Sequence, residues 1–176
     1  MLPYVDKPFA LFGHSFGGLV SFELARELRR AYGLEPEQLF VSGCAAARVF
    51  CGALCAHKLS GPDFLREMKR LSEIPAQVLE DDELMRIVAS ILRADFAISD
   101  SYAYREESPL DCPITVYGGL SDFFVTREHL DGWRKETSAS FSLRLFEGDH
   151  FFLHSSEKAV LAELGGSLAR LANSID

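Results

Sequence analysis

Short apolar runs alternate with a stretch of helical spacing in the first quarter of the chain. Residues 9–12 (FALF) are continuously apolar and end at a glycine-rich turn, and residues 39–43 (LFVSG) form a second such run. A short apolar run bounded by turn residues is typical of a strand buried on both faces of a parallel sheet. The pattern therefore predicts strands over 9–12 and 39–43.

A helix is predicted between these two strands, over residues 17–32. Its apolar residues Val20, Leu24 and Leu28 recur at four-residue spacing, and Gly33 can end it. The residues expected on its solvated side are Glu23, Arg26, Glu27 and Arg30. Strand, helix and strand in this order correspond to one βαβ unit.

The second half of the chain repeats this alternation. Apolar runs over 114–117 (ITVY) and 141–146 (FSLRLF) predict two more strands, and helical spacing follows them over 126–135 and 157–173. Alternating strands and helices predict an α/β fold, in which a mostly parallel sheet carries helices on both faces.

The connection between the second and third predicted strands is unusually long. It runs over residues 44–113, whereas a crossover needs only a dozen or so residues. Helical spacing recurs within it over 64–71 and 84–104, with Pro75 between the two. We predict a single domain over residues 1–176 with a helical lid insertion at about residues 52–108. An ordinary pair of peripheral helices is the alternative.

The charge balance narrows the classes of partner. The chain carries 18 Lys and Arg against 26 Asp and Glu, a formal net charge of −8. A nucleic-acid binder needs a basic face, and the longest basic run here is Arg29-Arg30. No apolar stretch approaches the roughly 18 residues that span a bilayer. Neither a nucleic-acid partner nor a membrane partner is expected.

The first residues and the cysteines bear on location and metal binding. Residues 1–8 (MLPYVDKP) have neither the basic nor the apolar region of a secretory signal, so a cytoplasmic location with free thiols is expected. Cys51, Cys55 and His57 cluster in sequence but supply only three candidate ligands. No metal site and no cofactor are therefore predicted.

Candidate chemistry begins at the turn after the first predicted strand. Residues 13–18 read GHSFGG, which matches G-x-S-x-G between a buried strand and a helix. In that context the turn is tight, the flanking positions must be nearly free of side chains, and the serine hydroxyl projects outward. Ser15 is the predicted nucleophile. The backbone N–H of Phe16, at the helix N-terminus, is a predicted oxyanion-hole donor.

A serine nucleophile needs a base to take its proton and an acid to orient that base. Asp122 follows the third predicted strand and His150 follows the fourth, and parallel strands place these ends at one edge of the sheet. We predict His150 as the general base and Asp122 as its orienting acid. Asp149 and His154 are the alternatives for these two roles, and His14 is expected to order the turn or line the pocket.

The sequence resembles the type II thioesterases of nonribosomal peptide and polyketide synthesis, which belong to the α/β-hydrolases. The resemblance implies a Ser-His-Asp triad that hydrolyses thioesters through an acyl-enzyme, without metal or cofactor. It implies an acyl or peptidyl carrier protein, loaded on its phosphopantetheine arm, as partner. A general carboxylesterase or acyltransferase and a catalytically silent fragment are the alternatives. The matching segments are residues 8–18 (PFALFGHSFGG), 22–28 (FELAREL), 39–43 (LFVSG), 92–96 (LRADF), 110–114 (LDCPI) and 148–152 (GDHFF).

The resemblance also implies an N-terminally truncated domain. Family members carry several strands before the turn that holds the serine nucleophile, and a loop among these strands donates a second oxyanion-hole amide. Only twelve residues precede Gly13 here. The chain is thus similar to roughly the last two-thirds of a family member. We expect that it is a fragment or that another chain supplies the missing strands.

Overall fold

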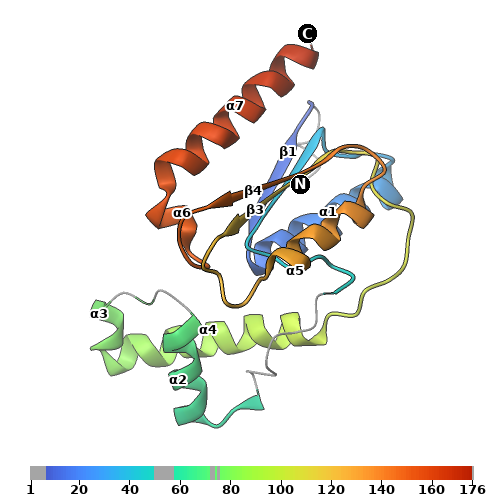
Figure 1. The fold of residues 1–176 in the computed structure, drawn as a ribbon. Coiled ribbons are helices and arrows are strands. Elements are labelled where there is room, and N and C mark those ends of the chain that lie inside the picture. The colour runs from blue at the N-terminus through green and yellow to red at the C-terminus, as the bar shows by residue number, and fades with distance from the viewer. Residues whose placement is uncertain (1–6, 50–57, 72–73, 75, 176) are drawn as a thin grey trace. The chain divides into compact units, whose positions relative to one another are not determined.

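The computed structural model describes residues 7–49, 58–71, 74 and 76–175. The chain forms two compact units (Figure 1): residues 1–49 together with 106–176 make up the first, and residues 50–105 the second. Nothing in the described part of the chain is a helix both long and apolar enough to cross a membrane.

The first unit is built on a parallel sheet, as the alternating pattern predicts. The four strands follow one another in the order β1-β2-β3-β4, and every neighbouring pair is parallel. Their carboxyl ends therefore lie at the same edge of the sheet. The strands are β1 (Ala10–His14), β2 (Gln38–Ser42), β3 (Ile114–Gly119) and β4 (Phe141–Phe146).

Helices cover both faces of this sheet. On one face the fully buried side chains of Leu39, Val41, Ile114 and Val116 lie on the side of α1 (Phe16–Tyr32) and α5 (Arg127–Asp131). On the other face Phe40 and Tyr117 pack in one cluster with residues of α6 (Phe152–Ser155) and α7 (Glu157–Ile175). The helix predicted over 126–135 is α5 followed by a 3₁₀ helix, η3 (Gly132–Glu136). The predicted α/β fold class is confirmed.

Two details of the first βαβ unit differ from the prediction. β1 lies at an edge of the described sheet, and it is not buried on both faces, since Phe12 is 40% exposed. The buried face of α1 also differs in part: Leu28 is buried as predicted, but Leu19 is buried in place of Val20, which is 50% exposed. Gly33 does end this helix, in the left-handed conformation.

Arg26 was expected on the solvated side of α1 but is 3% exposed. Its guanidinium forms ion pairs with Glu23 at 2.8 Å and Glu107 at 3.0 Å, and it lies over the Phe22 ring. Arginine can be buried in this way because paired carboxylates satisfy its charge. The burial of Arg26 could not be predicted from neighbouring residues, because Glu107 lies far along the chain.

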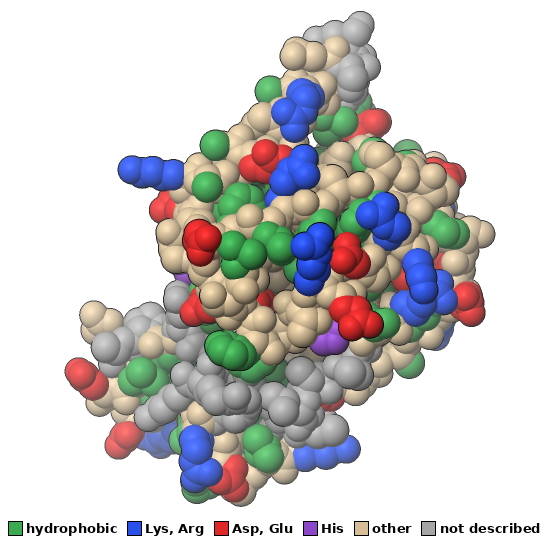
Figure 2. All heavy atoms as spheres, in the orientation of Figure 1, with side chains coloured by type: hydrophobic (Ala, Val, Ile, Leu, Met, Phe, Trp, Pro, Cys, Tyr) green, Lys and Arg blue, Asp and Glu red, His purple; other side chains and the backbone are tan. Residues whose placement is uncertain are grey.

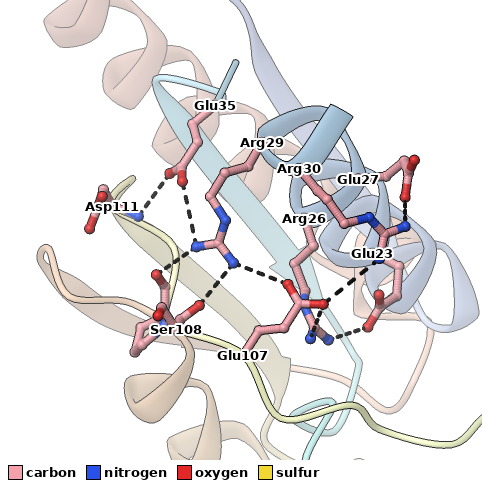
Figure 3. A network of polar contacts seen from close by, with 10 residues as sticks. Glu23, Arg26, Glu27, Arg29, Arg30, Glu35, Glu107, Ser108 and Asp111 are labelled. Atoms are coloured by element: carbon pink, nitrogen blue, oxygen red, sulfur yellow. Dashed lines mark hydrogen bonds and ion pairs between the residues drawn. The ribbon is translucent and has the colours of Figure 1, made fainter. Parts of the chain in front are cut away.

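Arg26 belongs to a network that fixes the segment leading into β3 against α1 (Figure 3). Arg29 donates hydrogen bonds to the carbonyl oxygens of Ser108 and Pro109, at 2.9 and 2.8 Å, and to the Glu107 carboxylate. Burial alone would raise the pKa of Glu107, but the hydrogen bonds and charges of Arg26 and Arg29 outweigh it and lower that pKa. The carboxylate is therefore ionised at neutral pH.

The second unit contains the helices α2 (Gly61–Leu71), α3 (Ala76–Leu79) and α4 (Asp82–Ser101). Asp81 caps α4 by accepting hydrogen bonds from the backbone N–H groups of Glu83 and Leu84. Phe64 is the buried centre of a small apolar cluster, and the Arg93 guanidinium lies 4.0 Å above its ring. Helix α4 ends at Ser101, three residues before the predicted end. A lid function for this unit stays a prediction.

The charged side chains are interspersed rather than grouped by sign on the face of the molecule that Figure 2 shows. Lys and Arg lie among Asp and Glu there, in keeping with the overall net charge of −8. The described side chains on this face therefore do not form the one-sided basic field that binds a phosphate backbone.

Replacing Arg26 with Met should lower the free energy of unfolding by about 1–3 kcal/mol, because it leaves Glu107 without its most buried partner. Urea denaturation at pH 7 measures this difference. The matched control is Arg127→Met, since Arg127 pairs with Asp131 on an exposed surface away from Glu107 and should contribute at most about 1 kcal/mol. Equal effects of the two variants would contradict a stabilising role for the buried pair.

Candidate active site

Ser15 occupies a strained turn between β1 and α1. Its φ is 53° and its ψ is −128°, and it alone among the described non-glycine residues has a positive φ. Such a conformation costs of the order of 1–3 kcal/mol and persists only where the surroundings impose it. The Ser15 N–H donates to the carbonyl oxygen of Ser42 on β2 at 2.7 Å, and the Ser15 carbonyl accepts from Gly18 N–H at 2.9 Å.

The glycines around Ser15 do not all serve the same purpose. A Cβ at Gly13 would overlap the carbonyl group of Gly17, and one at Gly18 would lie 2.9 Å from the Cys44 Cβ. At Gly17, by contrast, a Cβ would meet nothing within 4 Å. The prediction that both positions flanking the turn must be free of side chains is therefore right for Gly13 and wrong for Gly17.

The structure brings Ser15, His150 and Asp122 into one hydrogen-bonded chain. His150 Nε2 lies 2.9 Å from Ser15 Oγ, and His150 Nδ1 lies 2.8 Å from Asp122 Oδ2. The three residues follow β1, β4 and β3, so the carboxyl edge of the sheet gathers them from distant parts of the chain. Both imidazole nitrogens are thus engaged, one with a hydroxyl group and one with a carboxylate.

Asp122 is held in a buried, polar setting. Its side chain is 1% exposed, and Oδ1 accepts hydrogen bonds from the backbone N–H groups of Phe124 at 2.8 Å and Val125 at 3.0 Å. Burial by itself raises the pKa of this carboxyl, but the hydrogen bond and charge of His150, helped by the two amides, lower it below its ordinary value. An ionised Asp122 can fix the tautomer that has a proton on His150 Nδ1.

The alternatives to these residues occupy other positions. Asp149 Oδ1 accepts a hydrogen bond from the backbone N–H of Phe151 at 2.8 Å, so that carboxylate is turned to its own loop. His154 is exposed in α6. Phe16 is the first residue of α1, where backbone N–H groups have no acceptor within the helix. Its role as an oxyanion donor stays a prediction.

Two of the four cysteines, Cys44 and Cys112, are among the described residues, and both are buried. Burial raises the pKa of both Cys44 and Cys112 to about 12, so these thiols stay protonated. Cys51, Cys55 and His57 lie outside the described residues. Within the described ranges, no group of three or more His, Cys, Asp or Glu side chains is placed to hold a metal ion.

Two neighbours of the site went unnoticed in the sequence: Ser42 and Gly43, at the carboxyl end of β2. Ser42 is fully buried, and its hydroxyl lies 2.9 Å from His14 Nδ1. Gly43 has a φ of 54°. The sequence signal for both residues is a small polar residue followed by a glycine, at the end of the strand that pairs with β1.

A family profile described as "Thioesterase domain" matches residues 2–168. The chain is 43% identical over 171 residues to "Linear gramicidin dehydrogenase LgrE" of Brevibacillus parabrevis, covering 96% of this chain and 65% of that protein. It is 43% identical over 155 residues to "Gramicidin S biosynthesis protein GrsT" of Aneurinibacillus migulanus, covering 88% and 60%. The chain thus spans less than two-thirds of the length of these relatives.

The fold is shared with solved structures. One is described as "Structure of the type II thioesterase BorB from the borrelidin biosynthetic cluster". It matches with a TM-score of 0.83 at 34% identity, over 94% of this chain and 67% of that one.

Gly13→Ala should prevent the turn from forming, because its methyl group would overlap the Gly17 carbonyl, whereas Gly17→Ala should leave the fold intact. We expect Gly13→Ala to lose reaction of Ser15 with a fluorophosphonate probe, and Gly17→Ala to retain it within about 3-fold. Intact-protein mass spectrometry counts the labelled fraction. Loss of labelling in Gly17→Ala alone would overturn the assignment of the two glycines.

The lowered pKa of Asp122 also predicts a pH-dependent contribution to stability. A carboxyl whose pKa is lower in the folded state stabilises the fold above its ordinary pKa of about 3.9 and loses that contribution as the pH falls through the folded value. The difference in unfolding free energy between wild type and Asp122→Asn should therefore shrink as the pH falls from about 5 to below about 4. Urea unfolding across this range measures it, and a difference that grows on acidification would contradict it.

Proposed function

Because the chain belongs to the thioesterase domain family, we propose that it hydrolyses acyl thioesters through an acyl-enzyme formed on Ser15. The observation that carries this proposal is the hydrogen-bonded chain from Ser15 Oγ through the His150 imidazole to Asp122. A serine hydroxyl becomes a nucleophile when a positioned base takes its proton, and His150 Nε2 lies within that reach.

In the acylation half-reaction, Ser15 Oγ attacks the thioester carbonyl carbon while His150 Nε2 takes the hydroxyl proton. The resulting oxyanion accepts a hydrogen bond from the Phe16 N–H at the start of α1. As the C–S bond breaks, the proton on His150 passes to the departing thiolate sulfur. The products of this step are a free thiol and an ester between the acyl group and Ser15.

In the deacylation half-reaction, a water molecule takes the place of the thiol. His150 removes its proton, the hydroxide oxygen attacks the ester carbonyl, and the proton then returns to Ser15 Oγ as the carboxylic acid leaves. Asp122 keeps its negative charge throughout and stabilises the imidazolium formed in each half-reaction. Its lowered pKa supports this role, because the carboxylate stays ionised at neutral pH.

We propose that the substrate is an acyl group on the phosphopantetheine arm of an acyl or peptidyl carrier protein. Two similar proteins support a biosynthetic setting by their names: one is a gramicidin S biosynthesis protein, and the other is a type II thioesterase from the borrelidin biosynthetic cluster. In this proposal the carrier is the protein partner, the location is the cytoplasm, and the unit of residues 50–105 acts as the lid.

The edge position of β1 supports one further element of the proposal. β1 pairs with β2 on one side, and its other side has no partner strand among the described residues. Two donors stabilise an oxyanion better than one, and removal of one typically costs about 10²–10³ in rate. We propose that a strand and loop beside β1, from the same protein or another chain, supply the second donor.

A dehydrogenase is a second candidate, because one relative bears that name. The turn after β1 does not favour it. Dinucleotide-binding turns read G-x-G-x-x-G, and the first two glycines let the backbone approach a pyrophosphate. Here the sequence is GHSFGG, and the third position is the strained Ser15 hydrogen-bonded to His150. The site therefore favours serine chemistry over hydride transfer.

Ser15→Ala should abolish release of the acyl group from a loaded carrier protein, with a loss of at least about 10³-fold. High-performance liquid chromatography of the carrier, before and after incubation, measures the release. Ser140→Ala is the matched control, because this serine is exposed just before β4, at the opposite edge of the sheet.

Three outcomes would contradict this proposal. Release that persists in Ser15→Ala would overturn the nucleophile, and release that requires added nicotinamide cofactor would favour the dehydrogenase. Hydrolysis of a short p-nitrophenyl ester with no release from the loaded carrier would identify a general carboxylesterase in place of a carrier thioesterase.

A further inference from the structure

His14, the residue before the proposed nucleophile, packs against the proposed base. Its ring centroid lies 5.1 Å from that of His150, with the two planes tilted by 46°. The Phe152 ring packs against it in a T-shaped arrangement, with the ring centroids 6.0 Å apart. The His14 ring is therefore one of the surfaces that limit how His150 can turn about its hydrogen bond to Asp122.

Ser42 holds both His14 and Ser15 from the end of β2. Its carbonyl oxygen accepts the Ser15 N–H at 2.7 Å, and its hydroxyl lies 2.9 Å from His14 Nδ1. The sheet register places His14 opposite Ser42, and Ser42 is fully buried. One buried residue thus fixes the backbone of the nucleophile and the ring of its neighbour at the same time.

Gly43 makes room for this arrangement. Its φ of 54° turns the chain away after β2, and a Cβ there would lie 2.9 Å from His14 Cε1 and 3.4 Å from His150 Cε1. The absence of a side chain therefore lets both imidazole rings pack close to the end of β2. Any larger residue would have to displace one ring or the other.

We propose that His14 is a positioning residue, which Ser42 holds in place and which keeps the His150 imidazole aligned between Asp122 and Ser15. This inference rests on the proposed function, in which His150 is the general base. It assigns His14 no proton transfer. The second nitrogen, Nε2, is buried and has no hydrogen-bond partner within the described part of the chain, so the contact with Ser42 is the polar interaction that orients the ring.

The electrostatics of His14 suit a residue beside a base. Burial, followed by the neighbouring charge of His150, lowers its pKa to about 4; Asp122 raises it and His154 lowers it further by smaller amounts. The ring is therefore neutral at the pH where His150 must accept a proton. A cation at this distance would oppose that protonation, and a neutral ring does not.

Three variants separate the parts of this arrangement. His14→Asn keeps a polar group near the Nδ1 position but removes the ring. His14→Phe keeps a ring but removes the hydrogen bond to Ser42. Ser42→Ala removes the hydroxyl group of Ser42 and leaves its backbone carbonyl in place. The matched control is His154→Asn, because His154 is exposed and its charge affects the pKa of His14 less than burial and His150 do. The readout is the second-order rate constant for fluorophosphonate labelling of Ser15, which needs no thioester.

We expect Ser42→Ala and His14→Phe each to lower this rate constant roughly 3- to 10-fold, as for one hydrogen bond, and the double variant to lose no more than His14→Phe alone. His14→Asn should lower it roughly 10- to 100-fold, because a misaligned base costs more than a weakened contact. His154→Asn should stay within 2-fold. Wild-type labelling rates in His14→Asn and His14→Phe would overturn the proposal.

Nuclear magnetic resonance of ¹⁵N-labelled imidazoles supplies a readout that is independent of activity. We expect His150 to populate the Nδ1–H tautomer in the wild type and a mixture of tautomers in His14→Asn, whereas a residue needed only for folding would leave the tautomer unchanged. If the fluorophosphonate labels Ser15 but the protein hydrolyses no thioester, the proposed function is overturned and the positioning role of His14 still stands. Unchanged His150 resonances in His14→Asn would overturn the proposal and leave the proposed function standing.

Discussion

The left-handed backbone of Ser15 is the constraint on which the arrangement of the site depends. A φ of 53° is costly for a residue with a side chain, so the surrounding structure must hold it. Gly13 permits close passage of the chain at the Gly17 carbonyl, and the Ser42 carbonyl on the adjacent strand binds the Ser15 N–H. The parallel pairing of β1 with β2 therefore fixes where the serine hydroxyl projects, and the position required of His150 follows from it.

Helix α1 connects the turn at Ser15 with the segment that leads into β3. It begins directly after Ser15, and in its last turns Arg26 and Arg29 bind Glu107 and the carbonyl groups that follow it (Figure 3). That segment leads into β3, whose end carries Asp122. The helix that starts directly after Ser15 thus also anchors the segment that leads to Asp122. Because Arg26 is buried, this anchor is less screened by solvent than a surface ion pair.

The alternation of apolar runs and helical spacing was enough to predict the sheet of the first unit. Runs such as residues 39–43 and 114–117 mark strands that other strands and helices cover on both sides. Because these strands are buried, their own residues are apolar, and the burial can be predicted from them alone. The edge position of β1 and the burial of Arg26 could not be predicted in this way. Both depend on which segments lie beside them, and for Arg26 the deciding partner, Glu107, is 81 positions away.

For the site, the sequence by itself determined the strand-to-helix turn at Ser15 and the places of Asp122 and His150 after two later strands, because a tight strand-to-helix turn and strand ends have local signatures. Only the tertiary structure decided that His150 pairs with Asp122 while Asp149 binds its own loop, and that Gly17 is sterically free. It alone revealed that Ser42 and Gly43 support His14. Hydrogen bonds and ring contacts are set by distances of a few ångströms between separate strands, and no pattern along a single strand encodes them.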